Sequence, residues 1–139
     1  RRATLKARSA LVGLEGVLRI RSRPGTADLL ARLERILAGA HDVREVRLLA
    51  ALRDGRLPAD AEFTAGAGPL IGANGTGIAA RLGVEPDASG AELWTRGAEA
   101  LRDWQDRADD PEADPELRRA ASTVVRSCEG MLTELYRQG

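Results

Sequence analysis

Apolar residues that recur every three or four positions constrain the fold of this chain more than any other feature. The clearest run lies in the last quarter of the sequence, and its members are Leu117, Ala121, Val124, Cys128, Met131 and Leu135. Because a helix turns once in about 3.6 residues, these side chains share one helical face. Asp114 and Pro115 stand just before the run, where an N-cap and a first helical residue belong, so the sequence predicts a helix that begins there.

The first 55 residues carry three further runs of this kind, which predict helices over 4–21, from Thr26 to about Ala40, and from His41-Asp42 to Gly55. Gly39 is expected near the end of the second of these helices, and Asp42 is the expected cap of the third. The apolar stripe of the first contains Ala7, Leu11, Leu14 and Leu18. The expected buried face of the second contains Leu29, Leu33, Ile36, Leu37 and Ala40. That of the third contains Val43, Val46, Leu49 and Ala50. These segments predict an up-down-up arrangement with short connections.

Another helix is expected over 89–106. Ser89 and Glu92 form an S-x-x-E capping box at its start. Its stripe contains Trp94, Ala98, Leu101 and either Trp104 or Gln105. Together with the final helix it predicts a two-helix hairpin over 89–139, joined by an acidic turn with two prolines.

Residues 56–88 are rich in glycine and proline. Pro58 predicts a short helical turn that runs to Phe63, and Thr76 is the expected cap of a short helix that Gly83 ends. Between them we expect a loop from Ala65 to Gly77, because glycine and proline disfavour regular structure. The glycines expected to act as a hinge are Gly66, Gly68, Gly72, Gly75 and Gly77.

These segments predict one all-α domain over 1–139, a bundle of five to six helices with a glycine-rich central loop. Aromatic residues make up only 3% of the chain, and β-branched residues are scarce beside leucine and alanine, which disfavours a sheet.

Reactive side chains are too few for most catalytic or metal sites. The single cysteine, Cys128, lies on an apolar stripe and is expected to pack as a small hydrophobe. The single histidine, His41, stands at a predicted helix boundary, where its ring can donate to a terminal carbonyl. The glycine-rich loop lacks the Lys-Ser/Thr pair of a phosphate-binding loop. We therefore assign no catalytic, cofactor-binding or metal-ligating residue to this chain.

The net charge of zero hides a strong asymmetry. Residues 1–23 hold seven basic groups against one acid, whereas 85–116 hold eleven acids against three arginines. Arg19, Arg21 and Arg23 are clustered and are candidates for contact with an anionic surface. The alternative is that they form the solvated face of a packed helix. Nine apolar residues are candidates for helix interfaces: Leu11, Leu14, Leu18, Trp94, Leu101, Trp104, Val124, Met131 and Leu135.

Three stretches carry a resemblance to a known family. The runs LKARSALVGLEGVLR (5–19) and LLARLERILAGAHDVREVRLLAALRDG (29–55) resemble the helical region that follows the GTPase domain in actinobacterial dynamin-like proteins. The run LRRAASTVVRSCEGMLTEL (117–135) is similar to the way such chains end. The resemblance implies a GTPase domain upstream of Arg1, which agrees with a chain that does not begin with methionine. No catalytic residue of the family maps onto this chain.

The helical pattern and the resemblance are compatible with two functions of different class. The first is a non-catalytic helical segment of a dynamin-like GTPase, which couples nucleotide state to self-assembly or membrane remodelling. Its partners would be the adjacent GTPase domain, other copies of the protein or an anionic membrane surface. The second is a free-standing helical interaction or regulatory module without enzymatic activity. A nucleic-acid binder is a weaker third option, because the chain has no set of aromatic residues for stacking. The expected location is the cytoplasm, with membrane association left open.

Overall fold

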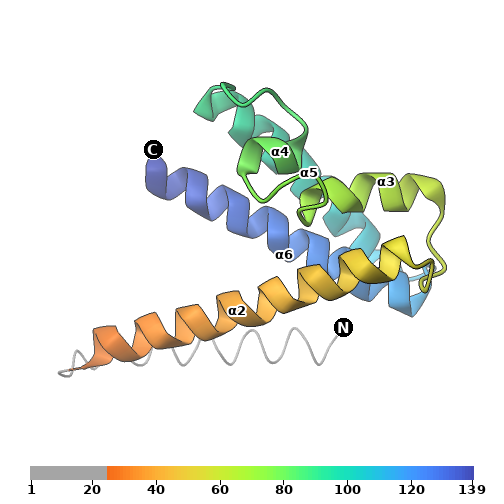
Figure 1. Ribbon diagram of the computed structural model, residues 1–139, viewed down its shortest axis with the longest axis horizontal. Helices are drawn as coiled ribbons and strands as arrows, with labels where there is room; N and C mark the ends of the chain where they lie inside the picture. The colour runs from red at the N-terminus through yellow and green to blue at the C-terminus, as the bar shows by residue number, and fades with distance from the viewer. Residues whose placement is uncertain (1–24) are drawn as a thin grey trace. The chain divides into compact units, whose positions relative to one another are not determined.

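The structure is a computed structural model, and it describes residues 25–139. Five helices follow one another in this part of the chain, and it contains no strand. They are α2 (Thr26–Arg53), α3 (Ala61–Leu70), α4 (Ile78–Leu82), α5 (Gly90–Asp109) and α6 (Pro115–Gln138) (Figure 1). The prediction of an all-α bundle is confirmed. The chain divides into two compact units, 1–40 and 41–139, with the boundary inside α2.

Several predicted features lie outside the described residues. They are the helix over 4–21, its stripe residues Leu11, Leu14 and Leu18, and the basic cluster Arg19, Arg21 and Arg23.

The hairpin of α5 and α6 is the best-packed part of the second unit (Figure 1). Both helices begin at the predicted caps. The Ser89 hydroxyl accepts a hydrogen bond from the Glu92 amide at 3.1 Å, and the Asp114 carboxylate accepts one from the Glu116 amide at 2.8 Å. The two helices approach closely at Gly97, where a Cβ atom would lie 3.0 Å from Leu132 Cδ2.

The face of α6 predicted from its spacing forms the centre of the core, with Ala121, Val124, Cys128 and Met131 all buried. Buried residues from the other helices, and Ile71 directly after α3, complete this core; they are Leu48, Leu52, Phe63, Ala67, Leu70, Ile71, Trp104 and Ala108. The Phe63 and Trp104 rings meet edge to face, with centroids 5.0 Å apart and planes at 80°. Burying each large apolar side chain contributes about 1.5–3 kcal/mol, so this cluster is the main source of stability.

The two helices predicted over 26–55 are one helix. Thr26 is the first residue of α2, but Gly39, His41 and Asp42 lie inside it, so the predicted break is wrong. One internal glycine costs only about 1 kcal/mol relative to alanine, and no proline interrupts this stretch. Asp42 therefore does not act as a cap.

The predicted buried faces of this region are also wrong in part. Leu29, Ile36, Val43 and Val46 are exposed, with 44%, 66%, 48% and 69% of their surface accessible to solvent. The buried residues of α2 are instead Glu45, Leu48 and Leu52. The helix carries apolar residues on more than one face, so periodicity alone does not identify the face that packs on the core.

The glycine-rich segment is partly helical, which corrects the predicted loop over 65–77. Pro58 precedes α3, and Asp60 caps it by accepting a hydrogen bond from the Phe63 amide at 2.7 Å. Gly66 and Gly68 lie within this helix. At Gly66 a Cβ atom would lie 3.2 Å from the Trp104 ring, so the small residue allows the helix to pack closely against that ring.

The irregular part of the segment is therefore shorter than predicted and covers residues 71–77. Gly72 and Gly75 have φ angles of 102° and 134°, which disfavour any residue with a side chain. Gly77, rather than Thr76, occupies the N-cap of α4. Gly83 ends that helix with φ 68°, as its position in the sequence predicts.

Candidate functional site

Four polar side chains from three helices meet inside the second unit, and we call them the Glu45 cluster. His41 and Glu45 come from α2, Arg81 from α4 and Ser127 from α6. Glu45 and Ser127 are buried, with 7% and 5% of their surfaces accessible. A buried charge is tolerated only where it is paired and hydrogen-bonded.

The Glu45 carboxylate is the centre of this cluster. One Arg81 guanidinium nitrogen donates to Glu45 Oε2 at 2.6 Å, and a second lies 3.4 Å from Oε1. The Ser127 hydroxyl donates to the same Oε2 at 2.5 Å. His41 Nε2 lies 3.4 Å from that oxygen and 2.9 Å from Ser127 Oγ. The carboxylate is therefore surrounded by donors from two other helices.

These contacts determine the ionisation of Glu45. Burial by itself raises the pKa of a carboxyl group, because it disfavours the charged form. Hydrogen bonds from His41, Arg81 and Ser127, with the charge of Arg81, outweigh that effect and lower the pKa of Glu45 from 4.5 to about 2. Glu45 is thus an anion at neutral pH.

Arg81 also binds two backbone carbonyls in the segment that precedes α4. It donates to the Leu70 carbonyl at 2.9 Å and, through Nε, to the Thr76 carbonyl at 3.0 Å. One side chain thus connects the end of α3, the glycine-rich turn and α4 to Glu45 of α2. A helix as short as α4 is unstable in isolation, so these contacts and its packing hold it in place.

The cluster contains a serine, a histidine and a carboxylate, but it lacks the arrangement of a catalytic triad. In a triad the acid binds Nδ1 of the histidine, whereas here Glu45 and Ser127 both lie at Nε2. His41 Nδ1 is buried and has no hydrogen-bond partner among the described residues. Ser127 donates to an ionised Glu45 that already pairs with Arg81. The geometry fixes the positions of three helices and does not activate a nucleophile.

This cluster was not predicted from the sequence, in which His41 stands at an expected helix boundary, whereas the residue lies inside α2. A signal was present in the sequence, because Glu45 stands at helical spacing from Leu48 and Leu52 and four residues after His41. A charged residue on an apolar face, with a histidine one turn away, indicates a buried polar contact.

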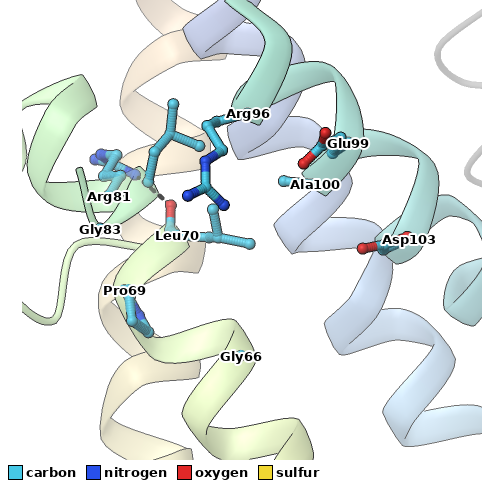
Figure 2. Close-up of a pocket in the computed structure, with 10 residues that line it drawn as sticks. Gly66, Pro69, Leu70, Arg81, Gly83, Arg96, Glu99, Ala100 and Asp103 are labelled. Atoms are coloured by element: carbon cyan, nitrogen blue, oxygen red, sulfur yellow. Dashed lines mark hydrogen bonds between the residues drawn. The ribbon is translucent and has the colours of Figure 1, made fainter. Parts of the chain in front are cut away.

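Two surface hollows lie in the same unit. The first, of about 280 Å³, is bounded by the end of α3, by α4 and by one side of α5. Figure 2 shows Arg96 extending from α5 toward Leu70, with Glu99 and Asp103 farther along the same helix. Two arginines and two acids line this hollow, so its charge favours neither an anion nor a cation.

The second hollow, of about 490 Å³, lies beside α4 and the last turns of α6. Apolar residues dominate its lining, among them Ile78, Val84, Leu93 and Leu135. Trp94, next in sequence to Leu93, is 45% exposed and does not belong to the core. Its part in a helix interface stays a prediction.

The remaining candidates from the sequence lie as follows. Trp104, Val124 and Met131 are buried in the core, and Leu101 and Leu135 are half-buried. Cys128 is fully buried, and burial raises the pKa of its thiol to about 12. The hinge glycines are divided between α3 and the turn that follows it, and a hinge motion stays a prediction.

The described residues contain neither a metal-ligating group nor a membrane-spanning helix. No group of three or more histidine, cysteine, aspartate or glutamate side chains in 25–139 has the arrangement needed for a metal ion. Within the same residues, no helix combines the length and the hydrophobicity required to span a bilayer.

Comparison with known proteins shows a similarity to a mycobacterial protein. The chain is 35% identical over 130 residues to the isoniazid-induced protein IniC of Mycobacterium tuberculosis, with the same values for the strains CDC 1551/Oshkosh and ATCC 25618/H37Rv. The alignment covers 94% of this chain but 26% of IniC, so the chain spans about a quarter of the length of these curated relatives. No protein-family model matches the chain, and no solved structure matches it.

Proposed function

We propose that this chain is a helical segment of a dynamin-like GTPase that couples nucleotide state to self-assembly or membrane remodelling. The observation that carries the proposal is the 35% identity to IniC, a dynamin-like protein, along 94% of this chain. Because the alignment covers only 26% of IniC, nucleotide binding and hydrolysis would belong to a part of the protein that this chain does not include.

The structure supports a mechanical role for the segment. α2 is one helix of 28 residues, about 42 Å long at 1.5 Å per residue. The Glu45 cluster connects this helix to α4 and α6 through a buried ion pair and hydrogen bonds. A displacement of α2 would therefore move the hairpin of α5 and α6, or would have to break these buried contacts.

Three partners follow from this proposal. They are the GTPase domain of the same protein, other copies of the protein and an anionic membrane surface. The basic residues Arg19, Arg21 and Arg23 would provide the membrane contact, because clustered arginines attract anionic headgroups.

The test uses the complete gene product, with whatever precedes Arg1. We expect the purified protein to hydrolyse GTP and to sediment with phosphatidylserine-containing vesicles more than with neutral ones. Changing Arg19, Arg21 and Arg23 together to glutamate should abolish the preference for anionic vesicles and leave GTP binding intact.

The matched control changes three exposed arginines of α5 and α6 to glutamate, namely Arg102, Arg126 and Arg137. It alters the net charge equally and should retain most of the vesicle binding. A gene product that binds no GTP would refute the proposal as a whole. Equal effects of the two triple variants would refute the membrane contact alone.

The apolar hollow of about 490 Å³ favours a second candidate, a free-standing helical module that binds a protein partner. A complete short reading frame with its own start codon, encoding this chain alone, would favour that function over the first.

A further inference from the structure

α2 carries exposed apolar side chains at a regular spacing. Leu29, Ile36 and Val43 stand seven residues apart, and Val46 follows three residues later. Between 44% and 69% of each of these side chains is accessible to solvent. Seven residues make almost two helical turns, so the four side chains form one narrow line along the helix, the pattern of a two-stranded coiled coil. We call these four residues the α2 stripe.

We propose that the α2 stripe is the contact surface for a second copy of this chain, whose α2 lies antiparallel to the first. The inference rests on the proposed function in one respect, since it names the surface for the self-assembly suggested there. The pairing itself requires no nucleotide and can be measured separately.

The register follows from the heptad positions. If Leu29, Ile36 and Val43 occupy a positions, then Arg32, Gly39 and Val46 occupy d positions. In an antiparallel pair each a residue faces a d residue of the other helix. Leu29 then packs against Val46 of the second copy, and the same contact recurs at the other end.

The centre of this register places Ile36 against Gly39 of the second copy. A Cβ atom at Gly39 would meet no atom within 4 Å, so nothing described in this chain fills the space beside it. An internal glycine weakens a helix, and residues 25–139 give no packing reason for this one. The side chain of Ile36 from the second copy fits this open position.

Charged residues beside the stripe favour the same register. Arg35 and Asp42 both occupy g positions, and in an antiparallel pair the g positions of the two helices face each other. Arg35 of each copy then meets Asp42 of the other, which gives two symmetric ion pairs. The twofold symmetry of a homodimer requires such self-complementarity.

A parallel pair is disfavoured by the same residues. It would place Arg32 directly against Arg32 of the second copy at a d position, where like charges repel. In the antiparallel register Arg32 faces Val43, so its aliphatic stem covers an apolar neighbour while the guanidinium reaches water. The helix dipoles also favour the antiparallel orientation.

The first experiment is sedimentation velocity of the 139-residue chain without nucleotide, between roughly 5 and 500 µM, a range suited to a small interface. We expect the apparent mass to rise from 14.8 kDa toward twice that value. Arg35→Glu or Asp42→Arg alone should weaken dimerisation about tenfold, because two attractions become repulsions. The double variant restores the pairs with reversed polarity and should recover the dimer.

Matched controls reverse one charge of the same sign at positions away from the α2 stripe. Arg44→Glu and Glu34→Arg alter exposed residues at b and f positions and should leave the dimer unchanged. All of these positions are exposed, so circular dichroism should show folded protein throughout.

Disulfide cross-linking determines the orientation. A mixture of the Leu29→Cys and Val46→Cys variants should form a cross-linked heterodimer, whereas neither variant alone should cross-link efficiently. The native Cys128 is fully buried and does not compete.

A chain that stays monomeric over the whole range would overturn the inference, and would mean that another protein or segment covers the stripe. Cross-linking of Leu29→Cys with itself would overturn the antiparallel register, as would a double charge swap that fails to recover the dimer. GTP binding by the complete gene product is measured independently, so failure of this pairing and failure of the proposed function are distinguishable.

Discussion

Replacing Glu45 by glutamine tests the cluster that connects α2 to the rest of the second unit. Glu45→Gln keeps the shape of the side chain and removes its charge. Arg81, whose side chain is 14% exposed, would then lack the partner that lies 2.6 Å away. The amide also presents two donors where Ser127 and His41 now meet a carboxylate oxygen. We expect a loss of stability and no change in the helical fold.

The magnitude follows from the ionisation of Glu45. The cluster lowers the pKa of this carboxyl from 4.5 to about 2, and one pKa unit corresponds to about 1.4 kcal/mol. The charged form therefore contributes about 3 kcal/mol to the stability of the native state at neutral pH. This value agrees with the 3–5 kcal/mol typical of removing one member of a buried ion pair. It is a large part of the roughly 5–15 kcal/mol that stabilises a domain.

The same linkage predicts a pH dependence. The unfolded chain binds a proton at Glu45 near pH 4.5, whereas the native state resists protonation until about pH 2. The stabilisation is thus complete above about pH 4.5 and disappears as the pH falls to about 2. Glutamine has no such dependence. The difference between wild type and Glu45→Gln should therefore shrink from about 3 kcal/mol at pH 7 toward zero at pH 2.

Urea unfolding followed by tryptophan fluorescence measures this difference, since Trp104 is buried in the core. Free energies of unfolding at pH 7, 5, 4, 3 and 2 suffice, and subtracting the variant from the wild type removes the contribution of the other carboxylates. Glu99→Gln, at an exposed residue of α5, is the matched control and should differ from wild type by less than about 0.5 kcal/mol. If Glu45→Gln matches the wild type at pH 7, or if the difference is the same at pH 7 and pH 3, the reasoning is refuted.

Three further predictions concern the backbone, the core and the thiol. Gly83→Ala should lower the free energy of unfolding by about 1 kcal/mol, because the φ of 68° at this position disfavours a side chain. Gly130→Ala lies inside α6 with no atom near its Cβ position and should raise the free energy of unfolding by about 0.5–1 kcal/mol. Thermal unfolding of both variants measures the contrast. Trp104→Ala should lower the free energy of unfolding by about 3–5 kcal/mol, whereas Trp94→Ala, at a residue that is 45% exposed, should lower it much less. Equal losses in urea unfolding would contradict the assignment of the core. Cys128 is fully buried with its thiol pKa raised to about 12, so maleimide labelling should be slow in native conditions and rapid in urea; rapid native labelling would contradict its burial.

Local signals in the sequence identified the helices that have capping residues at their ends. Ser89 and Asp114 accept amide hydrogen bonds at the first turns of α5 and α6, and Gly83 ends α4 in a left-handed conformation. The apolar spacing of α6 also identified the centre of the core, since its face is regular and single. Such features depend on a few neighbouring residues, and the sequence contains them completely.

The errors arose where a helix-breaking signal was too weak to end a helix, or where distant contacts decide the outcome. Gly39 and Asp42 have the appearance of a helix end and a cap, but α2 continues through both. Gly66 and Gly68 suggested a loop, whereas the Trp104 ring occupies the space beside Gly66 that a larger residue would need. The burial of Glu45 depends on Arg81, which is 36 residues away, and on Ser127, which is 82 residues away. Periodicity within a helix gives no information on such partners.

The place of α6 in the chain order has a consequence for how the protein becomes ordered during synthesis. Several core residues of the earlier helices, such as Leu48 of α2 and Phe63 of α3, belong to a cluster centred on Val124 and Cys128 of α6. Until the ribosome has made α6, these side chains lack the centre of their core, and Glu45 lacks its contact with Ser127. The α5–α6 hairpin itself pairs two helices that are neighbours in sequence and joined by a short turn, which favours rapid formation. Ordering of the unit is therefore expected late in translation but fast once α6 has emerged, and pulse labelling of nascent chains of increasing length would time it.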